Sequence, residues 1–418
     1  MRPLPILRLA VCLTVGYCGS AAAKTLNVQA GPDAAERLQT ALINAKPGDV
    51  VRLGAGRFDI SDGLSLDIAG VTVRGTDRDR TILSFDGQTA GADGLLVTGN
   101  GDVVEDLSIE NTKGNGIKSK GVDGITFRRL RVEWTAGAKE SNGAYGVYPV
   151  SSQHVLIDRV LVKGASDAGI YVGQSRFIVV QNSEAAFNVA GIEIENCYNA
   201  DVHDNLSTHN AGGILVFDLP GLPQMGGHSV RVYDNTVVDN DTPNFAPKGN
   251  IVAKVPTGTG MMIMANRDVH VFRNAISGNQ SVGIMLVAYV NAFTDVTYNP
   301  LPRDVYVHDN VIGRNGFDPK FDGGALLAKA LGGSIPPVMW DGVTRFKSPT
   351  GAASADVVRL VVNDGPVLNL QLVDQGVSLD AAKPTVVAKL GEGALPEPAP
   401  IMLPVARVDA PDRTASRP

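Results

Sequence analysis

A repeated dipeptide constrains the fold of this chain more than any other feature. A glycine followed by an apolar residue recurs at intervals of 22 or 23 residues, and two longer gaps equal one or two intervals plus an insertion. A unit this short cannot bury its own apolar face, so successive units must stack on one another. The dipeptides are Gly116-Ile117, Gly146-Val147, Gly169-Ile170, Gly191-Ile192, Gly213-Ile214, Gly260-Met261 and Gly283-Ile284.

Within each unit the pattern predicts short strands joined by tight turns. Apolar and polar residues alternate with the period of a β-strand, which places one set inward and the other outward. The inward set includes Ile192, Ile194, Val202 and Ile214. Asparagine tolerates the left-handed backbone of a corner, so stacked coils should align asparagines into two ladders. The first ladder would contain Asn182, Asn205, Asn235, Asn274 and Asn310, and the second Asn188, Asn210, Asn240, Asn279 and Asn315.

We therefore predict an all-β chain that forms a right-handed, single-stranded parallel β-helix over residues 24–345, including its caps. Nothing between the strands is long enough for the crossover helix of an α/β fold. An amphipathic helix beginning near Asp33, with Leu38 and Leu42 on its apolar face, would cap the N-terminal end. Residues 324–331 would plug the far end, residues 346–395 would add C-terminal strands, and residues 396–418 would form a disordered tail.

The N-terminus resembles a secretory signal peptide rather than part of the fold. Arg2 and Arg8 precede an apolar stretch, and small residues then lead to an expected cleavage site near Ala23. Cys12 and Cys18 leave a lipoprotein alternative open, although neither follows the Gly or Ala typical of a lipid-attachment site. No later segment is long and apolar enough to span a bilayer. We expect the mature protein to be periplasmic or secreted.

Net charge and the cysteine and histidine content limit which classes of partner and cofactor this chain can bind. Without residues 1–23 the net charge moves from −6 to −8, which argues against nucleic acid and anionic membranes as partners. Cys197 is then the one remaining cysteine, so no internal disulfide can form. It shares its place in the repeat with Ser152 and Ser175, which predicts a turn residue rather than a nucleophile. His203 and His308 share one outward slot but are separated by intervening coils, and His270 lies in a different slot, so we expect no metal site and no cofactor.

The Gly-Ile-x-Val and Ser-x-x-Val-x-Val-x-x-Asn patterns resemble the carbohydrate-binding and sugar-hydrolase repeats of the pectin-lyase-like superfamily. Residues 25 to about 345 look most like exported tandem β-helix-repeat proteins. That resemblance implies a polysaccharide ligand, and also a periplasmic c-type cytochrome partner, because such proteins tend to be encoded beside one. The catalytic motifs of the superfamily are missing: the chain has no Asp-Asp pair, and its nearest approach to Gly-His-Gly is Gly226-Gly227-His228-Ser229.

The outward residues of the Gly-Ile strands divide into a polar half and an apolar half. Glu193 and Glu195 are the candidate acid–base pair, and alternate outward residues lie roughly 6.6–7 Å apart, within the range of inverting glycosidases. A plain solvated face is the competing interpretation. The expected saccharide-binding residues are Lys118, Tyr148, Tyr171, Glu193 and Glu195.

The apolar half, here called the apolar stripe, consists of Leu215, Phe217, Met262, Met264 and Met285. Three interpretations of the stripe compete: insertions of the chain itself cover it, it binds a partner protein, or its thioethers bind Cu(I). We predict that residues 218–229 and 288–303 cover it and bury Phe217 and Met264. Asp218 or His228 would then lie at the rim of the polar half.

Two functions follow from these observations. The leading hypothesis is an exported protein that binds or processes an extended, acidic polysaccharide as a lyase, hydrolase or epimerase. The alternative is a non-catalytic periplasmic protein that docks a c-type cytochrome or a metal-handling protein through Phe217, Met262, Met264 and Met285.

Overall fold

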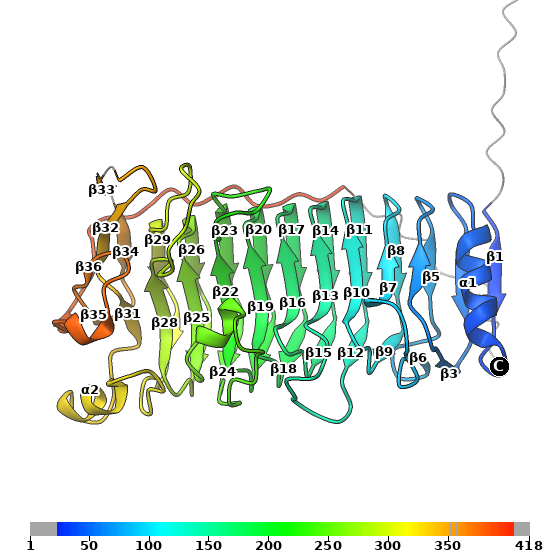
Figure 1. Ribbon diagram of the computed structural model, residues 1–418, viewed down its shortest axis with the longest axis horizontal. Helices are drawn as coiled ribbons and strands as arrows, with labels where there is room; N and C mark the ends of the chain where they lie inside the picture. The colour runs from blue at the N-terminus through cyan, green and yellow to red at the C-terminus, as the bar shows by residue number, and fades with distance from the viewer. Residues whose placement is uncertain (1–22, 352, 356–357, 405–418) are drawn as a thin grey trace, which may run out of the picture.

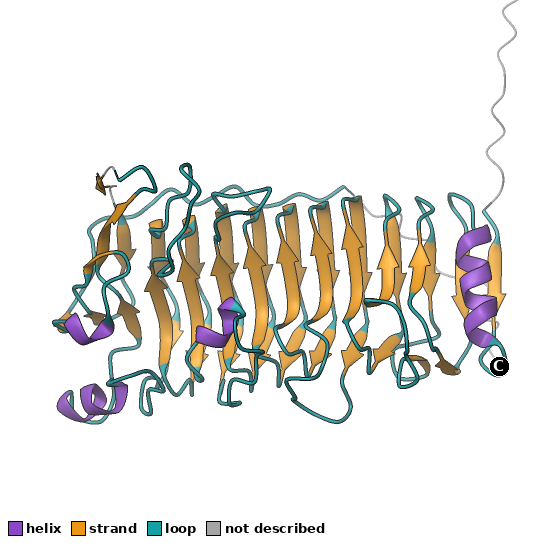
Figure 2. Ribbon diagram, viewed as in Figure 1, coloured by secondary structure: helices purple, strands orange, loops and turns teal. Residues whose placement is uncertain are grey.

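The computed structural model describes residues 23–351, 353–355 and 358–404, and it shows a parallel β-helix (Figure 1). Three long sheets run the length of the solenoid, and each coil contributes one strand to each sheet in turn. Strands dominate and helices are few (Figure 2). No helix within the described ranges is long and apolar enough to cross a membrane. The predicted signal peptide lies outside the described residues, apart from Ala23.

The strands are as follows. Sheet A contains β1 (Thr25–Val28), β2 (Val50–Leu53), β5 (Thr72–Arg74), β8 (Asp102–Glu105), β11 (Asp123–Arg128), β14 (Gln153–Asp158), β17 (Arg176–Gln181), β20 (Tyr198–His203), β23 (His228–Tyr233), β26 (Arg267–Phe272), β29 (Arg303–His308) and β34 (Leu360–Val362). Sheet B contains β3 (Gly56–Asp59), β6 (Thr81–Ser84), β9 (Ser108–Glu110), β12 (Arg131–Glu133), β15 (Leu161–Lys163), β18 (Glu184–Ala186), β21 (Leu206–Thr208), β24 (Thr236–Val238), β27 (Ala275–Ser277) and β30 (Val311–Ile312). Sheet C, which carries the Gly-apolar dipeptides, contains β4 (Leu64–Leu66), β7 (Asp93–Val97), β10 (Asn115–Lys120), β13 (Tyr145–Val150), β16 (Ala168–Gly173), β19 (Ala190–Glu195), β22 (Gly212–Phe217), β25 (Thr259–Met264), β28 (Val282–Val287), β31 (Val338–Trp340), β35 (Val367–Asn369) and β37 (Thr385–Val387).

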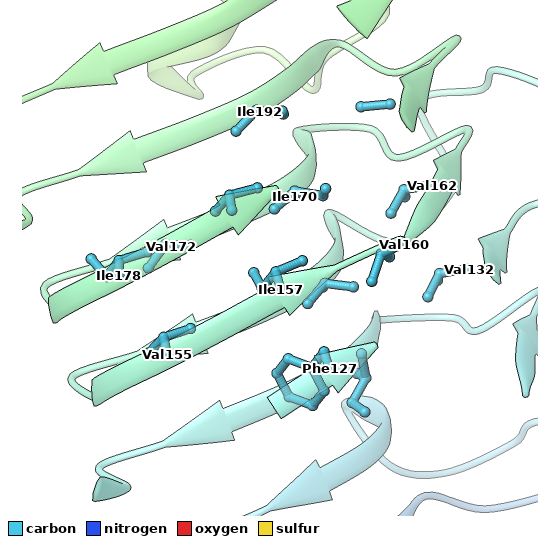
Figure 3. Packing of buried hydrophobic residues seen from close by; sticks show 14 of the residues in the cluster. Phe127, Val132, Val155, Ile157, Val160, Val162, Ile170, Val172, Ile178 and Ile192 are labelled. Atoms are coloured by element: carbon cyan, nitrogen blue, oxygen red, sulfur yellow. The ribbon is translucent and has the colours of Figure 1, made fainter. Parts of the chain in front are cut away.

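The core is the column of aliphatic side chains that alternation places inward. Ile192, Ile194, Val202 and Ile214 are all buried, as predicted. The register stacks like on like, since Ile170 faces Ile192 and Ile192 faces Ile214 in neighbouring strands. Figure 3 shows Ile170, Val172 and Ile192 pointing into the same interior as Ile157 and Val162 from the other two sheets. Hydrophobic burial along the whole axis therefore holds the coils together.

Two buried asparagine ladders fix the corners of the coil, as predicted. At the turn from sheet A to sheet B, the side-chain amide of Asn205 donates to Asn235 Oδ1 at 2.9 Å. At the turn from sheet B to sheet C, Asn188 donates to Asn210 Oδ1 at 3.0 Å. One member was assigned wrongly, because Asn182 pairs with Asp158 while Ser183 occupies the place beside Asn205. The buried amides are thereby satisfied without water.

A third stack lies at the turn from sheet C to sheet A and contains the free cysteine. The Ser152 N–H donates to Ser175 Oγ at 3.0 Å, and the Ser175 N–H donates to Cys197 Sγ at 3.5 Å. Burial raises the pKa of the Cys197 thiol. Cys197 is therefore a turn residue in a ladder, as the repeat predicts.

The ends of the solenoid agree with the sequence in part. Helix α1 (Ala34–Asn44) caps the first coil with Leu38 and Leu42 buried, as expected. Helix α2 (Gly324–Ala330) is not the final plug that the sequence suggested, because β31, β34 and β35 continue sheets A and C after it. A small sheet of β32 (Val343–Lys347), β33 (Ala353–Ala355) and β36 (Val373–Asp374) follows.

The tail requires a correction. Residues 396–404 were expected to be disordered, yet they lie extended along the outer face of sheet A, where the trace returns along the solenoid (Figure 1). Glu397 forms an ion pair with Arg231 at 2.8 Å, and the Ile401 N–H donates to Asp201 at 3.1 Å. These buried polar partners account for the ordered path. Residues 405–418 lie outside the described residues.

Candidate functional site

The outward residues of sheet C are where the sequence placed them, but they are not solvated. Tyr171 pairs with Glu193 across neighbouring strands, and Gly173 pairs with Glu195. Tyr171, Glu193 and Glu195 are 4%, 1% and 7% exposed, which contradicts the open groove that a saccharide-binding face would present. Only Lys118 and Tyr148, on β10 and β13, are half-buried. The polar half of the face is therefore partly enclosed.

Insertions between strands enclose this face. Residues 218–227 follow β22, residues 239–258 precede β25 and contain the short helix η1 (Ile251–Lys254), and residues 288–302 follow β28. The insertions are tied together, because Tyr298 donates to the Asp218 carbonyl at 2.6 Å and Lys254 hydrogen-bonds Asn291. Together these three insertions form what we call the roof. The roof covers the second half of sheet C, from Glu193 on β19 onward.

The apolar stripe lies under the same roof. Phe217 is 1% exposed, and Met262, Met264 and Met285 are equally buried. The prediction of self-covering is confirmed, with residues from all three insertions and from α2 packed against the stripe. The stripe thus offers no exposed surface for a partner protein, which removes the observation on which the cytochrome-docking alternative rested. The covering residues include Leu219, Met225, Val252, Val255, Phe293, Tyr298 and Ala328.

Beneath the roof, four carboxylic acids form what we call the acid cluster: Asp167, Glu193, Glu195 and Asp218. The Tyr171 hydroxyl donates to Glu195 Oε1 at 2.7 Å. Its ring can lie there because Gly173 has no side chain, since a Cβ at that position would sit 2.5 Å from the ring. The Tyr171–Glu195 pair is thus set by one glycine of the repeat.

The other half of the cluster is held by the insertion of residues 239–258. The Asn250 side-chain amide donates to Asp167 Oδ2 at 2.8 Å, and Tyr145 also hydrogen-bonds this carboxyl. Glu193 Oε2 is fully buried and has no hydrogen-bond partner among the described residues. A buried polar atom without a partner is rare in folded proteins and calls for a functional or structural reason.

Burial and mutual repulsion shift the acidity of this cluster. Burial raises the pKa of Glu195 to about 7 and that of Asp167 to about 6, against the hydrogen bonds that each accepts. Burial also raises the pKa of Asp218 to about 6. Burial, followed by the charges of Asp167 and Glu195, raises the pKa of Glu193 well above its ordinary value. At neutral pH the cluster therefore holds both protonated and ionised carboxyls, which is what acid–base catalysis needs.

Tyrosines line the cluster on the side of the open half of the face. Tyr145 packs against Tyr148 and Tyr171 with ring centroids 4.6 and 4.4 Å apart. Lys118 Nζ lies 4.8 Å above the ring of Tyr148. The sequence placed Lys118, Tyr148, Tyr171, Glu193 and Glu195 on one face, and these residues lie in one continuous arrangement along β10 to β19.

Three members of the site were not predicted. Tyr145 and Asp167 precede the repeat glycines Gly146 and Gly169, in positions where most coils carry small or apolar residues. These two departures from the repeat were the sequence signal that could have identified Tyr145 and Asp167 as site residues. Asn250 lies on an aperiodic insertion and carried no signal. Asp218 does lie near the polar half, where its charge acts on Glu195, whereas His228 instead stacks on Tyr198 of sheet A.

Two further histidines, His203 and His308, have structural roles. His203 and His308 share one outward column of sheet A, separated by Tyr233 and Phe272, and the four rings stack at 4.8–5.1 Å. Within the described ranges, no group of three or more His, Cys, Asp or Glu side chains is arranged to hold a metal ion.

Comparison with known proteins identifies the architecture. Residues 69–242 match the family model described as "Right handed beta helix region". No curated protein matches the sequence. Among solved structures, polygalacturonase from Erwinia carotovora ssp. carotovora is similar at a TM-score of 0.53 and 15% identity, over 76% of this chain and 90% of the other. The A-module of the Azotobacter vinelandii mannuronan C-5 epimerase AlgE4 gives 0.50 and 15%, over 84% and 97%. At such identities the likeness establishes the fold alone.

Proposed function

This chain has the right-handed β-helix fold of the pectin-lyase-like superfamily, and from that premise we propose that it binds and processes an extended, acidic polysaccharide at the acid cluster. Lys118 and Tyr148 would bind the sugar chain on the open half of sheet C. Glu193 and Glu195 would exchange protons with the sugar that reaches the cluster. The predicted signal peptide agrees with a polysaccharide outside the cytoplasm.

The single observation that carries this proposal is the burial of several acids together. Glu105 shows the contrast, because this buried acid is neutralised: it is 0% exposed and forms ion pairs with Arg74, Arg128 and Arg129. Burial raises the pKa of Glu105, but the bonds from Arg128 and Arg74 outweigh it, so that its pKa is lowered. Burying several carboxyls together without such cations is costly, because each charge disfavours ionisation of the others.

The chemistry follows from the protonation states. The raised pKa of Glu193 favours its protonated form, so we assign this residue the role of proton donor. Glu195, with a pKa of about 7, can accept a proton and is oriented by the Tyr171 hydroxyl. A donor and an acceptor on alternate outward positions suit either hydrolysis or the removal of a proton beside a uronate carboxylate.

Substrate entry requires the roof to move, because Glu193 is almost fully buried. The Asn250–Asp167 hydrogen bond joins the insertion of residues 239–258 to the cluster. We propose that this insertion lifts to admit the sugar and that closure then excludes water from the cluster. Lids of this kind are common in enzymes that process reactive intermediates.

A panel of polysaccharides tests the proposal. The mature protein, from Lys24 onward, would be incubated with alginate, polygalacturonate and uncharged glucans. Ultraviolet absorbance would report unsaturated products, a reducing-end assay would report hydrolysis, and proton NMR would report inversion at a sugar carbon. We expect one reaction on a uronate polymer and none on the glucans. No binding and no product with every polymer would contradict the proposal.

A further inference from the structure

A second pocket lies outside the acid cluster, at the corner where sheet C turns into sheet A. Its volume is about 390 Å³, within the range of small-molecule sites. It is lined by Asp123 and Gln153 from sheet A, by Gln174 and Arg176 at the turn, and by Gln224 of the insertion of residues 218–227. Planar polar side chains of this kind are suited to sugar hydroxyls.

Arg176 gives the pocket a fixed positive charge. Its Nε donates to Gln224 Oε1 at 2.9 Å, and its guanidinium carbon lies 5.1 Å from the ring centroid of Tyr198. Gln224 is itself anchored, since its amide donates to the Ser175 and Asn196 carbonyls. These contacts hold the guanidinium while its two terminal nitrogens remain available to bind a carboxylate through two parallel bonds.

Phe177 supplies an exposed aromatic surface next to Arg176. It is 39% exposed and stacks on His154 with ring centroids 5.3 Å apart and planes 10° from parallel. His154 in turn contacts the pocket, because its Nδ1 lies 2.6 Å from Asp123 Oδ1. The aromatic pair and the pocket are therefore parts of one surface.

The backbone of Phe177 adopts a conformation that is costly for a bulky side chain. Its φ is 54°, in the left-handed region, at a column position that the other coils fill with Gly124, His154, Asn199, Ser229, Asp268 and Asp304, all of positive φ. Those residue types tolerate that conformation, whereas a bulky aromatic side chain disfavours it. Since Phe177 is exposed, core burial does not offset this strain. What sets Phe177 apart from other exposed residues of positive φ is its place next to Arg176 and the polar pocket.

We propose that this corner pocket binds one uronate unit of the polysaccharide, as a second site distinct from the acid cluster. The sugar carboxylate would pair with Arg176, the hydroxyls would bind Asp123, Gln153 and Gln174, and the apolar face of the ring would pack on Phe177. The choice of a uronate as the ligand rests on the proposed function, whereas the pocket and its lining residues are independent of it. Such a site would hold the polymer on the protein while the cluster acts elsewhere along it.

The chain offers a matched control for Phe177. Phe187 is also exposed, at 46%, has a φ of 59° and stacks on a histidine, His209, at 5.1 Å. It lies at the turn from sheet B to sheet C, whereas Phe177 directly follows Arg176, which lines the corner pocket. Asparagine tolerates the left-handed backbone, so Phe177→Asn and Phe187→Asn should both fold.

Calorimetric titration with trigalacturonate, and with a neutral trisaccharide of the same length, tests this site. We expect Arg176→Gln to weaken trigalacturonate binding about tenfold or more and Phe177→Asn to weaken it severalfold. Phe187→Asn should bind like the parent, and the neutral sugar should bind weakly throughout. Equal affinity of Arg176→Gln and the parent, or no binding by the parent, would overturn the corner site.

The outcomes separate this site from the proposed catalysis. Loss of binding in Arg176→Gln, without turnover of any polymer by the parent, would support the corner site and contradict catalysis. Turnover by the parent, with unchanged trigalacturonate affinity in both pocket variants, would do the reverse. Melting temperatures close to that of the parent would show that the variants are folded.

Discussion

At the scale of single residues, the partners of a buried acid decide what that acid does. Glu105 and Glu193 are equally buried on outer faces of the same solenoid, yet arginines surround one and carboxyls surround the other. The arginines stabilise the ionised form of Glu105, whereas the neighbouring carboxyls favour the protonated form of Glu193. This contrast is why Glu193 and Glu195 are assigned to chemistry and Glu105 to structure.

The raised pKa of Glu195 predicts a pH dependence of stability. Its folded pKa of about 7 lies above its unfolded value, so its stabilising contribution is present below about pH 4 and is lost as the pH rises through 7. When the pH rises from 5 to 8, the free energy of unfolding should therefore fall less in Glu195→Gln than in the parent. The two decreases should differ by up to about 3 kcal/mol. Urea unfolding at the two pH values measures the difference, with Glu184→Gln on sheet B as the control. Identical pH dependence in parent and Glu195→Gln would contradict the assigned shift.

The inward register makes a second prediction at this scale. Ile194 is 0% exposed between stacked aliphatic neighbours. Ile194→Asp should lower the free energy of unfolding by about 4 kcal/mol or prevent folding, because a charge would be buried without a partner. Ile194→Val should cost only about 1 kcal/mol. Thermal melting compares the two, and a near-normal melt for Ile194→Asp would mean that the register is shifted by one residue.

Alternation in the sequence was sufficient to place individual side chains inward or outward. It correctly put Tyr171, Glu193 and Glu195 on one outer face, because a strand has a period of two. It did not reveal that this face is buried, because burial there depends on the paths of insertions, which follow no period. Asn250 reaches Asp167 across 83 residues of chain, and no local pattern encodes such a contact.

At the scale of elements, the repeat predicted what is repeated and missed what is inserted. The ladders at Asn188 and Asn205 were foreseeable because each coil presents the same turn to the next. Helix α2 was recognised as a helix but misplaced as an end cap, since its apolar residues cannot distinguish the end of the solenoid from the edge of the roof. Residues 396–404 were taken for a disordered tail because their composition, rich in proline, gives no hint of Arg231 and Asp201.

The roof over the acid cluster makes a prediction about motion. Asn250→Ala removes the hydrogen bond to Asp167 and should loosen the insertion of residues 239–258 without unfolding the solenoid. Hydrogen–deuterium exchange should increase in that insertion and remain unchanged in sheets A and B. Asn363→Ala, an exposed position near the end of sheet A, is the control. Unchanged exchange of the insertion in Asn250→Ala would show that this bond does not hold the roof closed.

At the scale of the whole molecule, the solenoid is uniform in its core and asymmetric on its surface. Sheet C is open over β10 and β13 and roofed from β19 onward, so the acid cluster lies where the open face ends. The corner pocket lies beside this face, at the turn from sheet C to sheet A that follows β16. A polysaccharide lying along the open face would thus approach both sites, and the rigid stack of coils keeps their spacing constant.

The central claim is that the buried acids act on a polysaccharide, and one matched comparison tests it most directly. The parent, Glu195→Gln and Glu184→Gln would be assayed side by side on the uronate polymer that gives the most product, with polymer binding measured in parallel. We predict that Glu195→Gln loses at least about a hundredfold in turnover while still binding the polymer, as removal of an acid–base group should, and that Glu184→Gln matches the parent. Equal turnover by the parent and Glu195→Gln would contradict the assignment of the acid cluster as the catalytic site.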